Sequence, residues 1–94
     1  MVLVTMEAHV PEDQWTALER AFGHVLKDRP DEIVLSLLAH DSHDPTLWRV
    51  LTVWESHEAL EAHYSSHDNM PSAYVFHLVS VVPTATLSQV VAYV

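Results

Sequence analysis

The segment Leu47–Glu55 is typical of a β-strand, yet apolar side chains fall on both of its faces. Odd-numbered and even-numbered residues take opposite faces: Leu47, Arg49, Leu51 and Val53 against Trp48, Val50, Thr52 and Trp54. An antiparallel sheet with one face in water alternates apolar and polar residues along each strand. This strand does not, so we expect its sheet to be covered on both sides.

Apolar runs and helical spacing predict the remaining elements. The predicted strands are Val2–His9, Ile33–Ala39, Leu47–Glu55, Tyr74–Val82 and Thr84–Tyr93. One helix is predicted to begin at Pro11 and stop at Pro30, and a second to run from Ser56 to about Ser66. This order predicts an α+β, ferredoxin-like βαββαββ fold, in which an antiparallel sheet carries two helices on one face. Domains typically have roughly 100–150 residues, so 1–94 is predicted to be a single domain.

Two helices can cover only one face of such a sheet, so the other apolar face needs a partner. Soluble monomers avoid a large apolar patch in water. A second copy packed sheet to sheet would close a dimeric α/β barrel, and we therefore expect a homodimer. The uncharged end Val90–Val94 would invite aggregation as a bare edge, so we expect it to pair with or lie across the partner. The alternative is a monomer in which one face is more polar than its pattern indicates.

Charge and composition exclude several classes of function. Lys and Arg total 4 against 13 Asp and Glu, which gives a net charge of −9. Nucleic acids and anionic membranes both require a basic surface, so neither is an expected partner. The absence of cysteine excludes a disulfide scaffold, a thiolate metal site and a cysteine nucleophile. The single glycine, Gly23, excludes a glycine-rich phosphate loop.

The last part of the chain is the only candidate for a membrane segment. No charged residue occurs from Asn69 to Val94, and a spanning helix needs about 20 apolar residues. Pro83 interrupts this stretch, and its valines and threonines favour strands. The N-terminus has no basic region and reaches Glu7 at once, unlike a signal peptide. We expect a cytoplasmic protein without a membrane segment.

The segment 44–62 carries a likeness to a known family. Its strand ends in Trp54-Glu55-Ser56, and the helix that follows begins with an acidic residue and alanine, Glu58-Ala59. With Arg29-Pro30 before the second strand and Pro71 before the fourth, the chain resembles the antibiotic biosynthesis monooxygenase (ABM) family. The likeness in topology covers essentially the whole chain, and the motif is confined to 44–62.

This resemblance implies a dimeric α/β barrel with a pocket between each subunit's sheet and its helices. Characterised members oxidise aromatic polyketides with O₂ and without metal or flavin, some relatives degrade haem, and others are quinol oxygenases. The polyketide-oxidising type has Asn four residues before the Trp and Tyr six residues after it, where this chain has Val50 and Leu60. The haem-degrading type uses an Asn in the first strand, and Val2–His9 contains none. The resemblance therefore implies the fold and pocket more strongly than the chemistry.

One face of the second predicted helix is the candidate active site. Leu60, His63, Tyr64 and His67 occur at i, i+3, i+4 and i+7, so they share that face. If it faces the sheet, the candidate catalytic residues are Trp54, His63, Tyr64 and His67, with Leu60 binding substrate. The indole could donate a hydrogen bond, and a histidine could remove a proton from an acidic phenol near neutral pH. Alternatively, Trp54 fills the core and the two histidines lie at the solvent edge.

Ser36 and His77 interrupt apolar runs in two predicted strands. They would bind substrate if they face the helices, or form hydrogen bonds at a dimer interface if they do not. His63 and His67 at i, i+4 could also hold a metal or supply an axial ligand to haem. Such a spacing arises readily by chance when 8 of 94 residues are histidine, so we expect no metal and no cofactor.

Two further features concern the loop between the second and third predicted strands and the start of the third strand. The cluster Asp41–Pro45 is expected to be a solvated hairpin turn. Arg49 is the only cation in its strand, and we expect it to pair with Glu7 or Glu55, within the chain or across the dimer.

Three functions are compatible with these features. The first is a cofactor-independent monooxygenase acting on a small aromatic substrate, polyketide-like or quinol-like. The second is a non-catalytic dimer that binds a small hydrophobic molecule, or a stress-associated protein with a vestigial pocket, which Val50 and Leu60 favour. The third is a haem-binding or haem-degrading protein.

Overall fold

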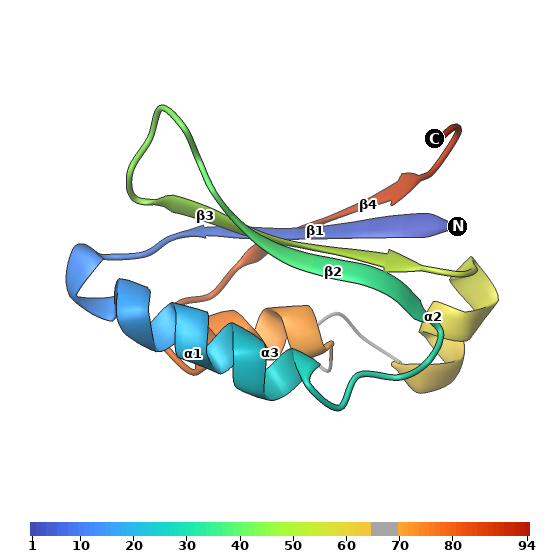
Figure 1. The fold of residues 1–94 in the computed structure, drawn as a ribbon, viewed down its shortest axis with the longest axis horizontal. Coiled ribbons are helices and arrows are strands. Elements are labelled where there is room, and N and C mark those ends of the chain that lie inside the picture. Colours follow the sequence, from blue (N-terminus) through green and yellow to red (C-terminus); the bar gives the residue numbers. More distant parts are fainter. Residues whose placement is uncertain (65–69) are drawn as a thin grey trace.

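The computed structural model describes residues 1–64 and 70–94 and shows one sheet with helices on one side. The elements are β1 (Val2–His9), the 3₁₀ turn η1 (Glu12–Gln14), α1 (Trp15–Leu26), β2 (Ile33–His40), β3 (Leu47–Trp54), α2 (His57–His63), α3 (Pro71–His77) and β4 (Thr84–Gln89). The antiparallel strands follow the order β2-β3-β1-β4. Helices α1 and α3 lie side by side under one face, and α2 lies at the end of β3 (Figure 1). The predicted ferredoxin-like α+β class is confirmed.

The predicted strand Tyr74–Val82 is wrong, because helix α3 occupies Pro71–His77. Pro71 is at the first turn of this helix, where its missing N–H breaks no hydrogen bond. Val75 and Phe76 are neighbours in the sequence and are both buried, whereas Tyr74 is 52% exposed. Neighbouring residues of a strand point to opposite faces, so this burial pattern is that of a helix. A short, continuous apolar run has no period that separates a strand from a buried helix, which is the reason for the error.

The C-terminal end differs from the prediction in two further ways. The last strand ends at Gln89 instead of Tyr93, although the N–H of Val90 still donates to the carbonyl of Met1 at 3.0 Å. The order of elements is therefore βαββααβ, with one strand fewer than predicted among the described residues. None of the helices in 1–64 and 70–94 has the length and apolar character needed to cross a membrane.

The core lies between the sheet and the pair α1 and α3. The even-numbered residues of β1 and β3 point into it and are buried: Val2, Val4, Met6, Ala8, Trp48, Val50, Thr52 and Trp54. From the helices, Leu18 and Phe76 meet them and are fully buried. The predicted division of β3 into two faces is confirmed, and its even-numbered face is the one under the helices.

The opposite face of the sheet, which we call the open face, is lined by apolar side chains that no described helix covers. Leu35 pairs with Val53 and Leu37 with Leu51 across this face. Leu35 and Leu37 are 51% and 40% exposed, respectively. The β2–β3 hairpin and the C-terminus both extend on this side of the sheet (Figure 1). The second apolar face is therefore present, and the homodimer that would cover it stays a prediction.

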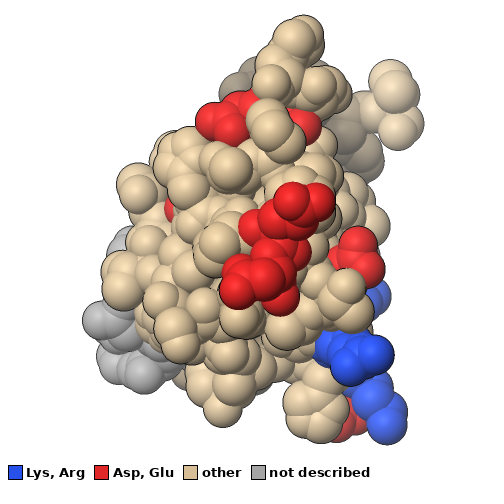
Figure 2. All heavy atoms as spheres, turned by 90° about the vertical axis from the view of Figure 1, so that its left-hand side faces the viewer, with Lys and Arg blue, Asp and Glu red and all other residues tan. Residues whose placement is uncertain are grey.

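A network of charges and hydrogen bonds organises the β2–β3 hairpin. Arg49 donates from Nε to Glu7 and from a terminal nitrogen to Asp41, both at 2.9 Å. Asp41 also accepts the backbone N–H groups of Asp44 at 2.7 Å and His43 at 3.0 Å. The expected Arg49–Glu7 pair is thus confirmed within one chain. The turn cluster is a hydrogen-bonded loop, at an end of the molecule where acidic side chains gather (Figure 2).

The same contacts lower the pKa of Asp41. The N–H of Asp44 contributes most, followed by the side chain of Arg49 and the N–H of His43. All three stabilise the ionised carboxylate and have no equivalent in the unfolded chain. Because the folded pKa lies below the unfolded value, this stabilisation is present above the unfolded pKa and is lost as the pH falls through the folded one.

Substitutions in α3 test the corrected assignment of this segment. Phe76→Ala should lower the free energy of unfolding by about 3–5 kcal/mol, because it leaves a cavity in the core. Tyr74→Ala should cost about 0.5 kcal/mol or less, since its side chain faces water. Urea unfolding measures both, and Phe76→Leu serves if the alanine variant does not fold. Equal losses at the two positions would support the strand.

Asp41→Asn tests the hairpin network through its dependence on pH. The variant should be less stable than the wild type at pH 7, because an amide lacks the charge that Arg49 and the backbone N–H groups stabilise. The difference should narrow as the pH falls below the unfolded pKa of about 3.9, where the wild-type carboxylate begins to lose this advantage. Urea unfolding at a series of pH values measures it, and a difference independent of pH would contradict the assignment.

Candidate functional site

Three of the predicted site residues come together where β3 passes into α2. Trp54 is the last residue of β3, and α2 begins three positions later at His57. Ser56 caps this helix, because its side-chain oxygen accepts the N–H of Ala59 at 3.0 Å. The helix has seven residues and ends at His63, so its last turn lies beside Trp54.

The rings of these residues form one aromatic cluster, which we call the Trp54 cluster: Trp54, His63 and Tyr64. The centroid of Trp54 lies 5.9 Å from that of His63 and 5.5 Å from that of Tyr64, whose ring meets it edge-on at 79°. The His63 and Tyr64 centroids are 6.1 Å apart. Edge-to-face contacts of this length are favourable and hold the rings in defined orientations.

The Trp54 cluster has a buried side and a side accessible to water. Trp54 is 1% exposed and Leu60 of α2 is 3% exposed, so both belong to the core. Tyr64 is partly buried, and burial raises the pKa of its phenol. Its hydroxyl therefore stays protonated, and able to donate a hydrogen bond, throughout the neutral range. The His63 side chain is 39% exposed, so for Trp54 and His63 the structure matches the second alternative, a core indole beside an imidazole that reaches solvent.

Glu32 is a member of this site that the sequence pattern did not identify. Its Oε2 lies 3.1 Å from Nε2 of His63. The carbonyl of Glu32 accepts the N–H of Glu55 at 2.9 Å, and the next residue, Ile33, pairs with Trp54. The signal for this contact is the register between β2 and β3, which is decided by pairing across the sheet and not by spacing along the chain.

The remaining predicted residues lie elsewhere or outside the described residues. Ser36 of β2 lies on the helix side, with its oxygen 3.1 Å from that of buried Thr52. His77 ends α3 and is exposed, so its expected place within a strand was wrong. His67 lies outside the described residues. Within 1–64 and 70–94, no group of three or more potential ligands could hold a metal ion.

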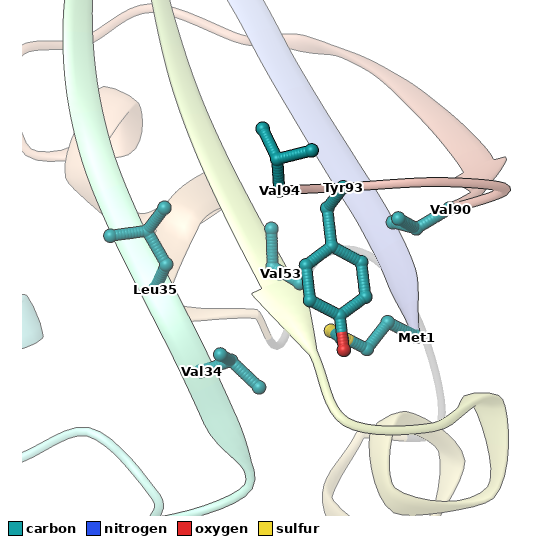
Figure 3. Close-up of a pocket in the computed structure, with 7 residues that line it drawn as sticks. All are labelled: Met1, Val34, Leu35, Val53, Val90, Tyr93 and Val94. Carbon is teal, nitrogen blue, oxygen red and sulfur yellow. The ribbon is translucent and has the colours of Figure 1, made fainter.

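A separate apolar hollow of about 250 Å³ lies on the open face. Its lining residues are Met1, Val34, Leu35, Val53, Val90, Tyr93 and Val94. The C-terminal segment passes over the strands here, and the ring of Tyr93 points toward Met1 (Figure 3). Val53 and Trp54 point to opposite faces, so this hollow and the Trp54 cluster lie on different sides of the sheet. The pocket expected between sheet and helices stays a prediction.

Comparison with solved structures shows that this fold is shared. A candidate antibiotic biosynthesis monooxygenase from Deinococcus radiodurans aligns with a TM-score of 0.75 at 14% identity, covering 100% of this chain and 96% of its own. A second, from Caulobacter crescentus CB15, gives 0.73 at 15% identity, covering 97% and 90%. A protein of the same description from Chloroflexus aurantiacus J-10-fl gives 0.68 at 17% identity, covering 98% and 94%. At these identities the likeness establishes the fold.

Comparison of the sequence with protein families gives an independent result. Curated individual proteins yield no match. The sequence pattern of the family described as antibiotic biosynthesis monooxygenase matches residues 1–69, which include β1, α1, β2, β3 and α2. The match covers well over half of the 94 residues and contains the whole Trp54 cluster. The chain therefore belongs to the antibiotic biosynthesis monooxygenase family.

Proposed function

We propose that the protein is a cofactor-independent monooxygenase that oxidises a small aromatic substrate at the Trp54 cluster. The observation that supports this is the contact of a partly exposed imidazole, His63, with a buried indole and a partly buried phenol. A flat, apolar substrate could contact the partly exposed rings of His63 and Tyr64, next to buried Trp54, while the imidazole removes a proton from it. Membership of the ABM family supports the class of reaction.

The proposed reaction needs two groups from the protein, a general base and a hydrogen-bond donor. His63 takes a proton from an activated CH₂ or a phenol, and the electron pair that remains on the substrate attacks O₂. One oxygen atom of O₂ becomes the carbonyl oxygen of the product. The other oxygen atom leaves as water with the two hydrogens that the substrate loses, so no external reductant is required. Tyr64 supplies a hydrogen bond to the negative charge that develops on oxygen, as a donor in a partly dry site does.

Oxygen uptake with hydroxylated anthrones and hydroquinones tests this proposal. His63→Ala should lower kcat about 100-fold or more, the usual contribution of a general base. Trp54→Phe should lower it about 10-fold if the indole N–H donates one hydrogen bond in the transition state. His57→Ala is the control, since His57 lies on the same helix and contacts Glu61 instead of the Trp54 cluster. No uptake by the wild type, or equal rates in all variants, would remove the proposal.

We also propose that the protein acts as a homodimer joined through the open face. Exposed Leu35 lines the apolar hollow, and exposed Leu37 follows it on the same face of β2. Together they form the kind of surface that soluble proteins cover. A second copy offers the same surface, so a two-fold arrangement buries both at once. The C-terminal segment at the hollow would then lie within or beside the contact.

Sedimentation at micromolar concentration tests the homodimer. We expect a mass twice that of the 10.6 kDa chain. Leu37→Glu should shift the protein to single chains, because it places a charge in the apolar contact. Leu78→Glu is the matched control, since Leu78 follows α3 on the opposite side and is 47% exposed. Single chains in the wild type, or dissociation by both variants alike, would argue against this interface.

A second candidate function is the binding of a small hydrophobic molecule without turnover. Val50 and Leu60 are apolar and buried, at positions where the oxidising members that the chain resembles have polar groups. In that case the same aromatic compounds should raise Tm without consuming oxygen. The haem-binding alternative stays a prediction.

A further inference from the structure

We infer that the apolar hollow on the open face is a binding site for a small, uncharged ring compound, separate from the Trp54 cluster. The basis is a cavity of about 250 Å³ whose lining residues all belong to one chain. Val53 lines this cavity, and Val53 and Trp54 point to opposite faces of the sheet. The inference therefore does not depend on the proposed monooxygenase activity.

A β-bulge in β2 forms one wall of the hollow. Ile33 pairs with Trp54 and Leu35 pairs with Val53, so the register leaves Val34 as the extra residue between them. In a regular strand, Val34 and Leu35 would point to opposite faces. Here both are about half exposed, at 53% and 51%, and both line the hollow. The bulge thus turns an additional apolar side chain to the open face, as bulges beside binding sites do.

The C-terminal segment forms the opposite wall. The N–H of Val90 donates to the carbonyl of Met1 at 3.0 Å, which holds the segment where β4 ends. Beyond this point the chain passes over the strands, and Tyr93 and Val94 line the hollow from that side (Figure 3). Tyr93 is 75% exposed, so its ring lies at the mouth. A small molecule can enter between these two parts of one chain, whereas a second sheet would rest on the outside of the segment.

The lining residues decide the class of ligand. Six of the seven have apolar side chains, and the hydroxyl of Tyr93 is the one polar side-chain group among them. A charged group placed there would lose its water without gaining a partner, so we expect an uncharged ligand. One hydroxyl or carbonyl oxygen on the ligand can bond to the Tyr93 hydroxyl, which both donates and accepts.

The volume limits the ligand to a compound of two rings. An apolar cavity of about 150 Å³ holds benzene, so a cavity of about 250 Å³ accommodates two fused rings with about ten carbon atoms. Such a ligand makes mostly apolar contacts, and we expect a Kd of about 0.1–1 mM.

Titration of the full chain with 2-naphthol tests the inference. Two-dimensional ¹H–¹³C spectra should show shifts of the methyl signals of Met1, Val34, Leu35 and Val53, because the naphthalene ring would lie against them. The methyl signals of Leu60, which is buried on the helix side, should stay unchanged. A titration that leaves the signals of the hollow where they are, whether or not Leu60 responds, would overturn the inference.

Val34→Glu should weaken the binding of 2-naphthol about 10-fold, because it places a carboxylate in the apolar wall. Leu37→Glu is the matched control. Leu37 lies on the same strand and face, is 40% exposed and is not among the lining residues. This variant should bind 2-naphthol as the wild type does. If Val34→Glu does not fold, Val34→Thr keeps the shape of the side chain and should weaken binding about 3-fold.

The same control separates a small molecule from a second copy as the occupant. Binding by Leu37→Glu and not by the wild type would show that a second copy fills the hollow. Equal losses in Val34→Glu and Leu37→Glu would show that the homodimer forms the site. Either result would overturn the inference and leave the proposed activity at the Trp54 cluster untouched. Binding by a wild type that sediments as single chains would support the inference and remove the homodimer.

The cation 2-naphthylmethylammonium tests the class of ligand. The net charge of −9 attracts it to the protein. It should nevertheless bind at least about 5-fold more weakly than 2-naphthol, because the hollow offers no partner for its charge. Equal or tighter binding of the cation would overturn the assignment to uncharged compounds.

Discussion

Backbone hydrogen bonding of β3 to β1 on one side and to β2 on the other decides where the buried side chains of this protein lie. Trp54 pairs with Val2 in one neighbour and with Ile33 in the other. A central strand has its register set twice, and a slip by one residue would turn its even-numbered face away from the helices. The positions of the core, of Trp54 and of the end of β3 that leads into α2 all depend on this pairing.

Helix α2 places His63 beside Trp54, which this register positions. It is too short to be stable alone, and the Ser56 cap and buried Leu60 hold it at the end of β3. Its last turn therefore brings His63 next to a ring that the sheet has already placed. Glu32, which directly precedes β2, lies 3.1 Å from His63 on the side of this other neighbouring strand. In the function that we propose, His63 is a base that must exchange protons with water and contact an apolar substrate, and a place at the edge of the core allows both.

Charge and apolar surface are separated along the molecule. Arg49, Asp41 and Glu7 form their network at the hairpin, whereas the hollow lined by Val53 and Tyr93 lies by the chain termini. The network leaves two carboxylates around one guanidinium, so two such ends would repel each other if they met directly. In the homodimer that we propose, this repulsion would favour an arrangement that keeps the hairpin ends apart, with the apolar surface in the contact.

Much of the fold follows from local patterns along the chain. Ser56 caps α2 as predicted, Pro11 directly precedes the 3₁₀ turn that leads into α1, and α1 ends at Leu26, before Pro30. The alternation in Leu47–Trp54 identifies both apolar faces of β3. The spacing of His63 and Tyr64 from Leu60 predicted a common helix face. The structure brings both rings to Trp54, although α2 ends at His63 and Tyr64 follows it in extended backbone. Each of these inferences concerns residues close in sequence, where spacing and caps carry the information.

Tertiary packing alone decided that α3 is a helix and that Glu32 contacts His63. The run Tyr74–Val82 is apolar except for His77 and Ser80, so its spacing could not separate a strand from a helix, and burial of Phe76 in the core selected α3. Glu32 lies 31 positions from His63 in the sequence, and only the register of β2 against β3 brings them within 3.1 Å. Local propensity and periodicity were therefore enough for most elements. The carboxylate partner of the imidazole depended on contacts between strands, which no local pattern encodes.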